Sequence, residues 1–214
     1  LIAIHKHGLR DEFRDEAVAE ARRVAQLPLG EEREDLTHLP IVAIDPEDAR
    51  DHDDAIWAQA RADGEGWDAI VAIADVSFYV RPGSALDKEA RARGNSVYFP
   101  DRVVPMLPHE LSSGICSLKE GEDRAALACH LHIGKDGALK SWRFSRARIR
   151  VAANIAYEDA QAMADKFLPE LASGRGTAEG GGGAPPSVAG ATATSPSKLG
   201  KELWTAALAP LWDC

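Results

Sequence analysis

The sequence has few cysteines, few aromatic side chains and no long apolar run. Its three cysteines, Cys116, Cys129 and Cys214, are odd in number and irregularly spaced, which matches neither a disulfide framework nor a zinc-binding pattern. This usage predicts a cytoplasmic protein in a reducing compartment. No stretch approaches the roughly 20 apolar residues that a membrane helix needs, and no signal-peptide cleavage site follows the opening residues. We therefore expect no membrane partner.

Basic residues are also scarce relative to acidic ones. Lys and Arg total 25 against 34 Asp and Glu, which gives a net charge of −9 with histidine neutral. This balance argues against a protein that coats nucleic acid, because phosphate binding depends on Lys and Arg. It does not exclude a nucleic-acid enzyme that concentrates acidic residues at a metal site. The length of 214 residues is ample for a packed core.

Local patterns predict an α+β fold, a mixed β-sheet with flanking helices. Helices are predicted over 15–25, 84–93 and 156–166, and strands over 41–44, 55–59, 67–74, 97–99, 124–133 and 138–151. Ser84 and Asp87 resemble a capping box at the start of the second helix, and Gly94 is expected to end it. The apolar run within 67–74 predicts a strand that is buried on both faces.

The most informative stretch is an acidic loop, IDPEDARDHDDA, at residues 44–55. It holds six carboxylates: Asp45, Glu47, Asp48, Asp51, Asp53 and Asp54. Like charges at this density need a cation or full solvation, and carboxylate oxygens select Mg²⁺, Mn²⁺ or Ca²⁺. Paired Mg²⁺ ions suit hydrolysis of a phosphodiester. The alternatives are a solvated acidic loop or a Ca²⁺-stabilised structural loop, and His52 could pack, be solvated or act as a ligand.

Two further groups of residues leave alternatives open. Arg146, Arg148 and Arg150 share one face of a strand by the two-residue period, so they predict either an RNA phosphate track or a solvated strand face. Tyr98 and Phe99, taken alone, are most simply core aromatics.

The acidic loop and the segments after it carry a family resemblance. IDPEDARDHDDA is followed by VAIADVSFYVRPGSALDKEA, then by YFPDRVVPMLP and ELSSGICSL. In this order and spacing the motifs resemble the RNB catalytic domain of the ribonuclease II / ribonuclease R family, closer to the ribonuclease R branch. The resemblance covers residues 1–165 and, weakly, 199–214.

This resemblance implies a processive, hydrolytic 3′→5′ exoribonuclease that needs Mg²⁺, with Mn²⁺ as a possible substitute, and that degrades single-stranded RNA to 5′-nucleoside monophosphates. It places metal ligands at Asp45, Asp51, Asp53 and Asp54, with Asp53 and Asp51 in catalytic roles. It also places Tyr98 as the aromatic that stacks on the 3′-terminal nucleotide. It implies cold-shock and S1 RNA-binding modules elsewhere in a full-length, monomeric protein.

The resemblance also suggests how the chain is divided. We predict a lead-in segment and helix over 1–40, the N-terminal part of the catalytic domain over 41–172, a disordered insertion rich in Gly, Ala, Ser and Pro over 173–198, and the start of a further helix over 199–214. The family's downstream motif, which holds an arginine and a second aromatic, has no counterpart here. We therefore expect an incomplete catalytic domain, with a non-catalytic RNA-binding or regulatory protein as the alternative.

Overall fold

The computed structural model describes residues 4, 6–30 and 32–172, with side chains through residue 165. Its helices are α2 (Asp15–Val24), α3 (Val76–Tyr79), α4 (Ala85–Arg93), the short π-helical turn η1 (Leu111–Ile115) and α5 (Tyr157–Ala172). Its strands are β1 (Glu34–Asp35), β2 (Val42–Asp45), β3 (Asp54–Ala60), β4 (Gly66–Ala74), β5 (Val97–Phe99), β6 (Arg102–Val104), β7 (Asp123–Gly134), β8 (Leu139–Arg150) and β9 (Ala153–Ala156). The predicted insertion and the predicted final helix, residues 173–214, lie outside the described residues.

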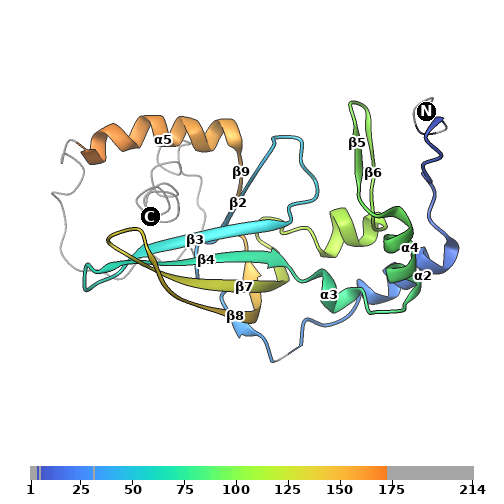
Figure 1. The fold of residues 1–214 in the computed structure, drawn as a ribbon, viewed down its shortest axis with the longest axis horizontal. Helices are drawn as coiled ribbons and strands as arrows, with labels where there is room; N and C mark the ends of the chain where they lie inside the picture. Colours follow the sequence, from blue (N-terminus) through green and yellow to red (C-terminus); the bar gives the residue numbers. More distant parts are fainter. Residues whose placement is uncertain (1–3, 5, 31, 173–214) are drawn as a thin grey trace.

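A seven-stranded sheet with the order β1-β8-β7-β4-β3-β2-β9 forms the centre of the molecule (Figure 1). The five central strands pair antiparallel, whereas β1 joins β8 and β9 joins β2 in parallel. β5 and β6 form a separate two-stranded hairpin that projects away from the sheet. The predicted α+β fold with a mixed sheet and flanking helices is confirmed.

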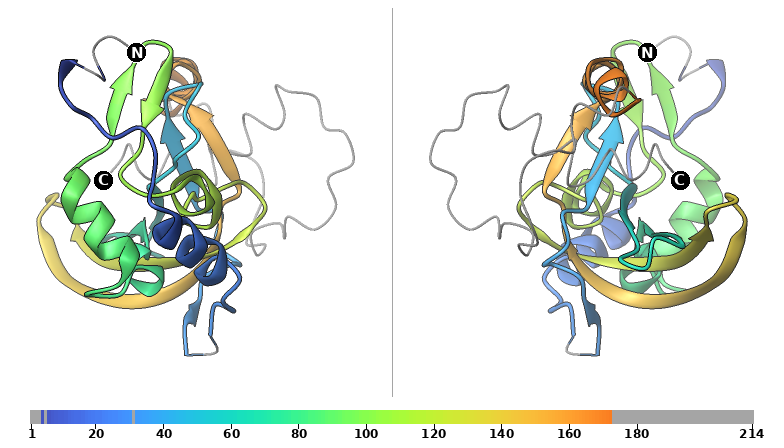
Figure 2. Two further views of the ribbon diagram at one scale, coloured as in Figure 1. Left: turned by 90° about the vertical axis from the view of Figure 1, so that its right-hand side faces the viewer. Right: turned by 90° about the vertical axis from the view of Figure 1, so that its left-hand side faces the viewer.

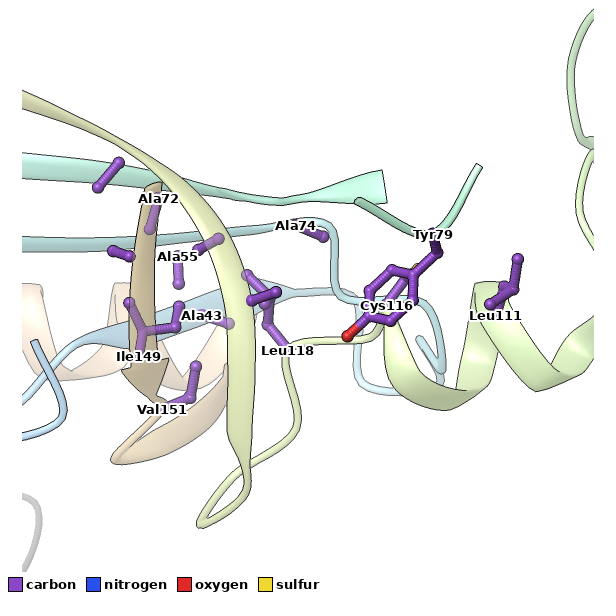
Figure 3. Packing of buried hydrophobic residues seen from close by; sticks show 14 of the residues in the cluster. Ala43, Ala55, Ala72, Ala74, Tyr79, Leu111, Cys116, Leu118, Ile149 and Val151 are labelled. Carbon is purple, nitrogen blue, oxygen red and sulfur yellow. The ribbon is translucent and has the colours of Figure 1, made fainter. Parts of the chain in front are cut away.

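One face of the sheet carries the main hydrophobic core. Its side chains are mostly small, and they alternate along the strands with residues of the opposite face, as the two-residue period requires. The labelled core residues in Figure 3 come from the sheet and from the segments packed on it: Ala43, Ala55, Ala72, Ala74, Tyr79, Leu111, Cys116, Leu118, Ile149 and Val151. Figure 2 shows the curved strands β7 and β8 passing around α2, whose Ala17 and Ala21 are buried against this core.

The opposite face of the sheet is covered unevenly. α5 packs over β2 and β9, where Ala160 and Ala164 join a smaller apolar cluster with Val42 and Ile155. Further along the same face, four large apolar side chains stay exposed on β4, β7 and β8: Ile73, Leu127, Trp142 and Phe144. The prediction that 67–74 is buried on both faces is therefore wrong at Ile73, which is 45% exposed because α5 does not extend over β4.

Helix α4 begins and ends where the sequence predicts. The Ser84 hydroxyl accepts a hydrogen bond from the Asp87 amide at 3.1 Å, and the Asp87 carboxylate accepts one from the Gly83 amide at 2.8 Å. Gly94 ends the helix with a φ of 82°, a value that glycine adopts readily. No helix in the described part of the chain is both long and apolar enough to cross a membrane.

Candidate active site

The acidic loop connects two neighbouring strands at one end of the sheet. β2 ends at Asp45 and β3 begins at Asp54, and the two strands run antiparallel with Val42 opposite Ile56. The chain therefore leaves the sheet at Asp45 and returns to it at Asp54 on the adjacent strand. This hairpin-like path brings the first and last aspartates of the loop to the same end of the sheet, as the sequence predicted.

A buried serine fixes the far side of the loop. The Ser117 hydroxyl donates to the Arg50 carbonyl at 3.0 Å and accepts from the His52 amide at 3.2 Å. The next residue, Leu118, donates its amide to the His52 carbonyl at 2.9 Å. Ser117 is fully buried, so these hydrogen bonds are shielded from water. The backbone of the loop is thus held in place even though most of its carboxylates face solvent.

Asp53 is the aspartate of the loop whose pKa is raised by lost hydration and by the charges of its neighbours. Loss of hydration against the surrounding protein raises the pKa of Asp53, and repulsion from Asp51, Asp54 and Asp45 raises it further, while His52 opposes the shift. Its charge also reaches the thiol of Cys116, whose pKa is raised to about 12, chiefly by burial. Asp51, Asp54 and Asp45 therefore lie close enough to Asp53 to destabilise its charge.

Asp45 has a specific partner within the loop. Its Oδ2 lies 2.7 Å from His52 Nδ1, and both side chains are mostly buried, with 17% and 14% exposed. His52, for which the sequence left packing, solvation and metal binding open, is thus packed against the first aspartate. The contact fixes one oxygen of Asp45 and the orientation of the imidazole ring.

Tyr98 joins the loop from the β5–β6 hairpin. Its hydroxyl donates to Asp51 Oδ2 at 2.7 Å, and this hydrogen bond, with burial as a smaller cause, raises the pKa of Tyr98 to about 12. Tyr98 is 63% exposed, so its side chain remains accessible to a ligand. The reading of Tyr98 as a core aromatic is therefore wrong, because only its hydroxyl is anchored.

The structure brings the four aspartates together but does not present them as a finished metal site. Within residues 4, 6–30 and 32–172, no three His, Cys, Asp or Glu side chains are arranged to hold a metal ion. Asp45 and Asp51 each have one oxygen engaged by His52 and Tyr98. The residues present nevertheless fit a hard divalent cation, because such ions bind carboxylate oxygens. Beyond the loss of hydration, the neighbouring aspartates repel the charge of Asp53 and raise its pKa, and a bound cation would offset this repulsion. The assignment of metal ligands stays a prediction.

The three arginines that were predicted to bind RNA phosphates are each paired with an aspartate of the protein. Arg146 binds Asp75 at 2.7 Å, Arg148 binds Asp35 at 2.6 Å and Arg150 binds Asp123 at 2.7 Å. Each guanidinium group is thus already paired within the protein, and RNA would have to compete with these partners. The RNA-binding role of the three arginines stays a prediction.

The sequence did not single out two buried polar residues. Ser117 anchors the acidic loop. Asp75, next to the end of β4, accepts hydrogen bonds from Arg33, Arg146 and Ser77 at 2.7–2.9 Å. Both lie within motifs that carry the family resemblance, which was the available signal. Their partners are distant in sequence, so no local pattern reveals the contacts.

Comparisons with known proteins define the class. The family model described as RNB domain matches residues 33–173, well over half of the chain, and the chain belongs to this family. The solved structure of Mycoplasma genitalium RNase R in complex with double-stranded RNA has a TM-score of 0.68 at 30% identity, covering 78% of this chain and 29% of that chain. The fold and the acidic loop are therefore those of an RNB domain.

Within this family the chain is similar to ribonuclease R. Ribonuclease R of Vibrio parahaemolyticus is 47% identical over 170 residues, covering 76% of this chain and 20% of the relative. Ribonuclease R of Escherichia coli is 45% identical over 150 residues, covering 70% of this chain and 17% of the relative. The resemblance drawn from the motifs is confirmed. The chain spans about a fifth of the length of these relatives.

Proposed function

We propose that this chain forms the N-terminal part of the catalytic domain of a processive 3′→5′ exoribonuclease of the ribonuclease R type. It hydrolyses single-stranded RNA to 5′-nucleoside monophosphates with Mg²⁺, for which Mn²⁺ can substitute. The observation that carries the proposal is the convergence of Asp45, Asp51, Asp53 and Asp54 on one loop of an RNB domain. The ribonuclease R names of its relatives support the substrate class.

The side chains divide the chemistry among them. Asp45 and Asp54, at the ends of adjacent strands, would hold a divalent ion, and Asp51 would hold a second ion or the attacking water. When bound, such ions lower the pKa of a water and offset the charge of the phosphate. Asp53, which lies beside the other three aspartates, would take the catalytic role by helping to hold an ion and to orient the attacking water.

Tyr98 supplies the contact to the end of the RNA. Its exposed ring can stack on the last base, and stacking accepts every base because each has a π-face. Such a contact typically stabilises binding by ~1–3 kcal/mol per base. An enzyme that removes nucleotides irrespective of sequence needs this kind of recognition.

The proposal is tested on the full-length protein with RNA labelled at its 5′ end. In Mg²⁺, we expect stepwise shortening from the 3′ end and release of 5′-nucleoside monophosphates, and we expect both to stop when EDTA is added. Internal cleavage products, or shortening that is unchanged in EDTA, would contradict it.

A second candidate is a non-catalytic RNA-binding or regulatory protein built on the same domain. The observation that favours it is that the described residues contain no arranged group of three metal-binding side chains. It predicts a gel shift with single-stranded RNA and no degradation in Mg²⁺ or Mn²⁺. A structural Ca²⁺ loop would instead show preference for Ca²⁺ and no affinity for RNA.

The cellular setting follows from the same proposal. We propose a cytoplasmic monomer whose cold-shock and S1 modules deliver single-stranded RNA to this domain. Cysteine usage supports the compartment, and the size of the relatives supports further modules. Sedimentation of the full-length protein with and without RNA tests the oligomeric state.

A further inference from the structure

The β5–β6 hairpin stands apart from the main sheet. Its two strands pair only with each other, with Tyr98 opposite Val103. At its base, the Met106 amide donates to the Ser96 hydroxyl at 2.9 Å and Arg93 donates to the Pro105 carbonyl at 3.3 Å. An isolated two-stranded hairpin is marginally stable, so contacts away from the base decide where its middle lies.

One hydrogen bond ties the middle of this hairpin to the acidic loop. The Tyr98 hydroxyl donates to Asp51 Oδ2 at 2.7 Å across a sequence separation of 47 residues. Among the described residues, it is the one side-chain hydrogen bond that joins residues 97–104 to another element. The position of Asp51 and the position of the hairpin are therefore coupled.

The bond occupies one oxygen of a carboxylate in the acidic loop. Asp51 is one of the four predicted metal ligands and lies two residues before Asp53. An O–H donor at Oδ2 of Asp51 fixes the orientation of the carboxylate and leaves the other oxygen free to accept a further contact. Without the donor, the Asp51 side chain would be free to adopt other rotamers.

We propose that the hydroxyl of Tyr98 is a positioning group that holds the Asp51 carboxylate in place for binding a divalent cation, separately from any stacking by its ring. The inference rests on the proposed function and adds a second role to the same side chain. Stacking of a base on the ring and binding of a cation at the acidic loop would then be coupled through Tyr98. The hydroxyl and the ring can be removed independently, which makes the two roles separable.

The test compares Tyr98→Phe, which keeps the ring and loses the hydroxyl, with Tyr98→Leu, which loses both. Tyr157→Phe makes the same chemical change at a 55% exposed tyrosine at the start of α5 and serves as the matched control. Each is made in the full-length protein. Mn²⁺ binding is measured by electron paramagnetic resonance without RNA, and kcat and KM are measured on single-stranded RNA in Mg²⁺.

We expect Tyr98→Phe to weaken Mn²⁺ binding and lower kcat by roughly tenfold each, the size of a lost hydrogen bond to a charged group, with KM nearly unchanged. Tyr98→Leu should show the same loss of Mn²⁺ binding and a raised KM as well. In an Asp51→Asn background, Tyr98→Phe should cause no further loss of Mn²⁺ binding.

The outcomes separate this inference from the proposed function. Normal Mn²⁺ binding and normal kcat in Tyr98→Phe overturn the inference, and so does an effect confined to KM, which would place the hydroxyl on the RNA. If Asp53→Asn still degrades RNA, the proposed active site itself is wrong. Mn²⁺ binding reports on the hydroxyl even if the protein degrades no RNA.

Discussion

At the scale of single residues, Asp53 reports on how closely the aspartates of the loop approach one another. The folded state raises its pKa through partial loss of hydration and through the charges of Asp51, Asp54 and Asp45, although the side chain stays exposed. An acid with a raised folded pKa binds more protons in the folded state than in the unfolded one, so its contribution to stability falls as the pH rises. The loss begins near the unfolded pKa of about 4 and is complete above the folded pKa.

Replacing Asp53 by Asn should therefore stabilise the metal-free protein at neutral pH. This gain in the free energy of unfolding should shrink toward zero as the pH falls below the unfolded pKa, because Asp53 is then protonated in both the folded and the unfolded state. Thermal unfolding in EDTA across a pH series measures it, with Asp48→Asn as a control that removes a carboxylate of the same loop outside the four predicted metal ligands. If the stability of Asp53→Asn and of the wild type depended on pH in the same way, the neighbouring aspartates would not be raising the pKa of Asp53.

Asp75 illustrates the opposite case, a buried carboxylate with sufficient partners. Burial by itself would raise its pKa, but hydrogen bonds from Ser77 and Arg33 and the charge of Arg146 outweigh it, so the pKa is lowered. Asp75 is 4% exposed, and the Arg33 side chain is 5% exposed. Removing the charge of Asp75 would leave a buried guanidinium without its counter-ion.

We expect Asp75→Asn to lower the free energy of unfolding by about 3 kcal/mol or more at neutral pH. Because the folded pKa of Asp75 lies below its unfolded value, this stabilisation is present above the unfolded pKa and is lost as the pH falls through the folded pKa. Urea unfolding at several pH values checks both points. Asp63→Asn, at an exposed pair with Arg61, should change the free energy of unfolding far less.

At the scale of elements, α4 shows how a local signal becomes a measurable contribution. The Ser84 hydroxyl caps the helix at the Asp87 amide, at 3.1 Å. Ser84→Ala should reduce the free energy of unfolding by about 1 kcal/mol, the usual effect of losing such a cap. Chemical denaturation measures this, and Ser141→Ala, at an exposed position of β8, should have a smaller effect. A loss at Ser84 no larger than at Ser141 would contradict the capping role.

The elements also show what sequence patterns can and cannot reveal. β3, β4, β7 and β8 were predicted because each contains several apolar side chains, which are nearly continuous in β4. β1, β6, β9 and α3 were missed; they are two to four residues long and offer little pattern to recognise, although the equally short β2 and β5 were predicted. The parallel pairing of β9 with β2 joins residues more than 100 positions apart, such as Val42 and Ala153, and no local pattern encodes it.

The acidic loop was predictable for a related reason. Asp45, Asp51, Asp53 and Asp54 lie within one short stretch, so their proximity is a local property that the motif carries. Their partners His52 and Tyr98 differ in this respect: His52 lies in the loop, whereas Tyr98 reaches Asp51 from a separate hairpin. The pairing of Arg146 with Asp75 was likewise invisible, because it depends on how β8 lies beside β7 and β4.

At the scale of the whole molecule, the two faces of the sheet differ in how much they contribute to stability. Ile149 is fully buried in the main core, whereas Trp142 and Phe144, on the same strand, are 62% and 59% exposed on the opposite face. Removing a buried side chain loses its burial and leaves a cavity. Removing an exposed one loses little of either, whatever its size.

We therefore expect Ile149→Ala to lower the free energy of unfolding by about 2–5 kcal/mol. Trp142→Ser and Phe144→Ser should each lower it by less than about 1 kcal/mol, although both remove larger side chains. Denaturant titration of the three variants checks the order. An equal or larger loss at Trp142 would show that this face is covered in the folded protein.

The catalytic role of the acidic loop is best measured by the degradation of 5′-labelled single-stranded RNA by the full-length protein and its Asp53→Asn variant in Mg²⁺. We expect the wild type to shorten the RNA from its 3′ end, and Asp53→Asn to bind the same RNA with similar affinity and leave it intact. Degradation by Asp53→Asn at the wild-type rate would show that the acidic loop is not the catalytic site.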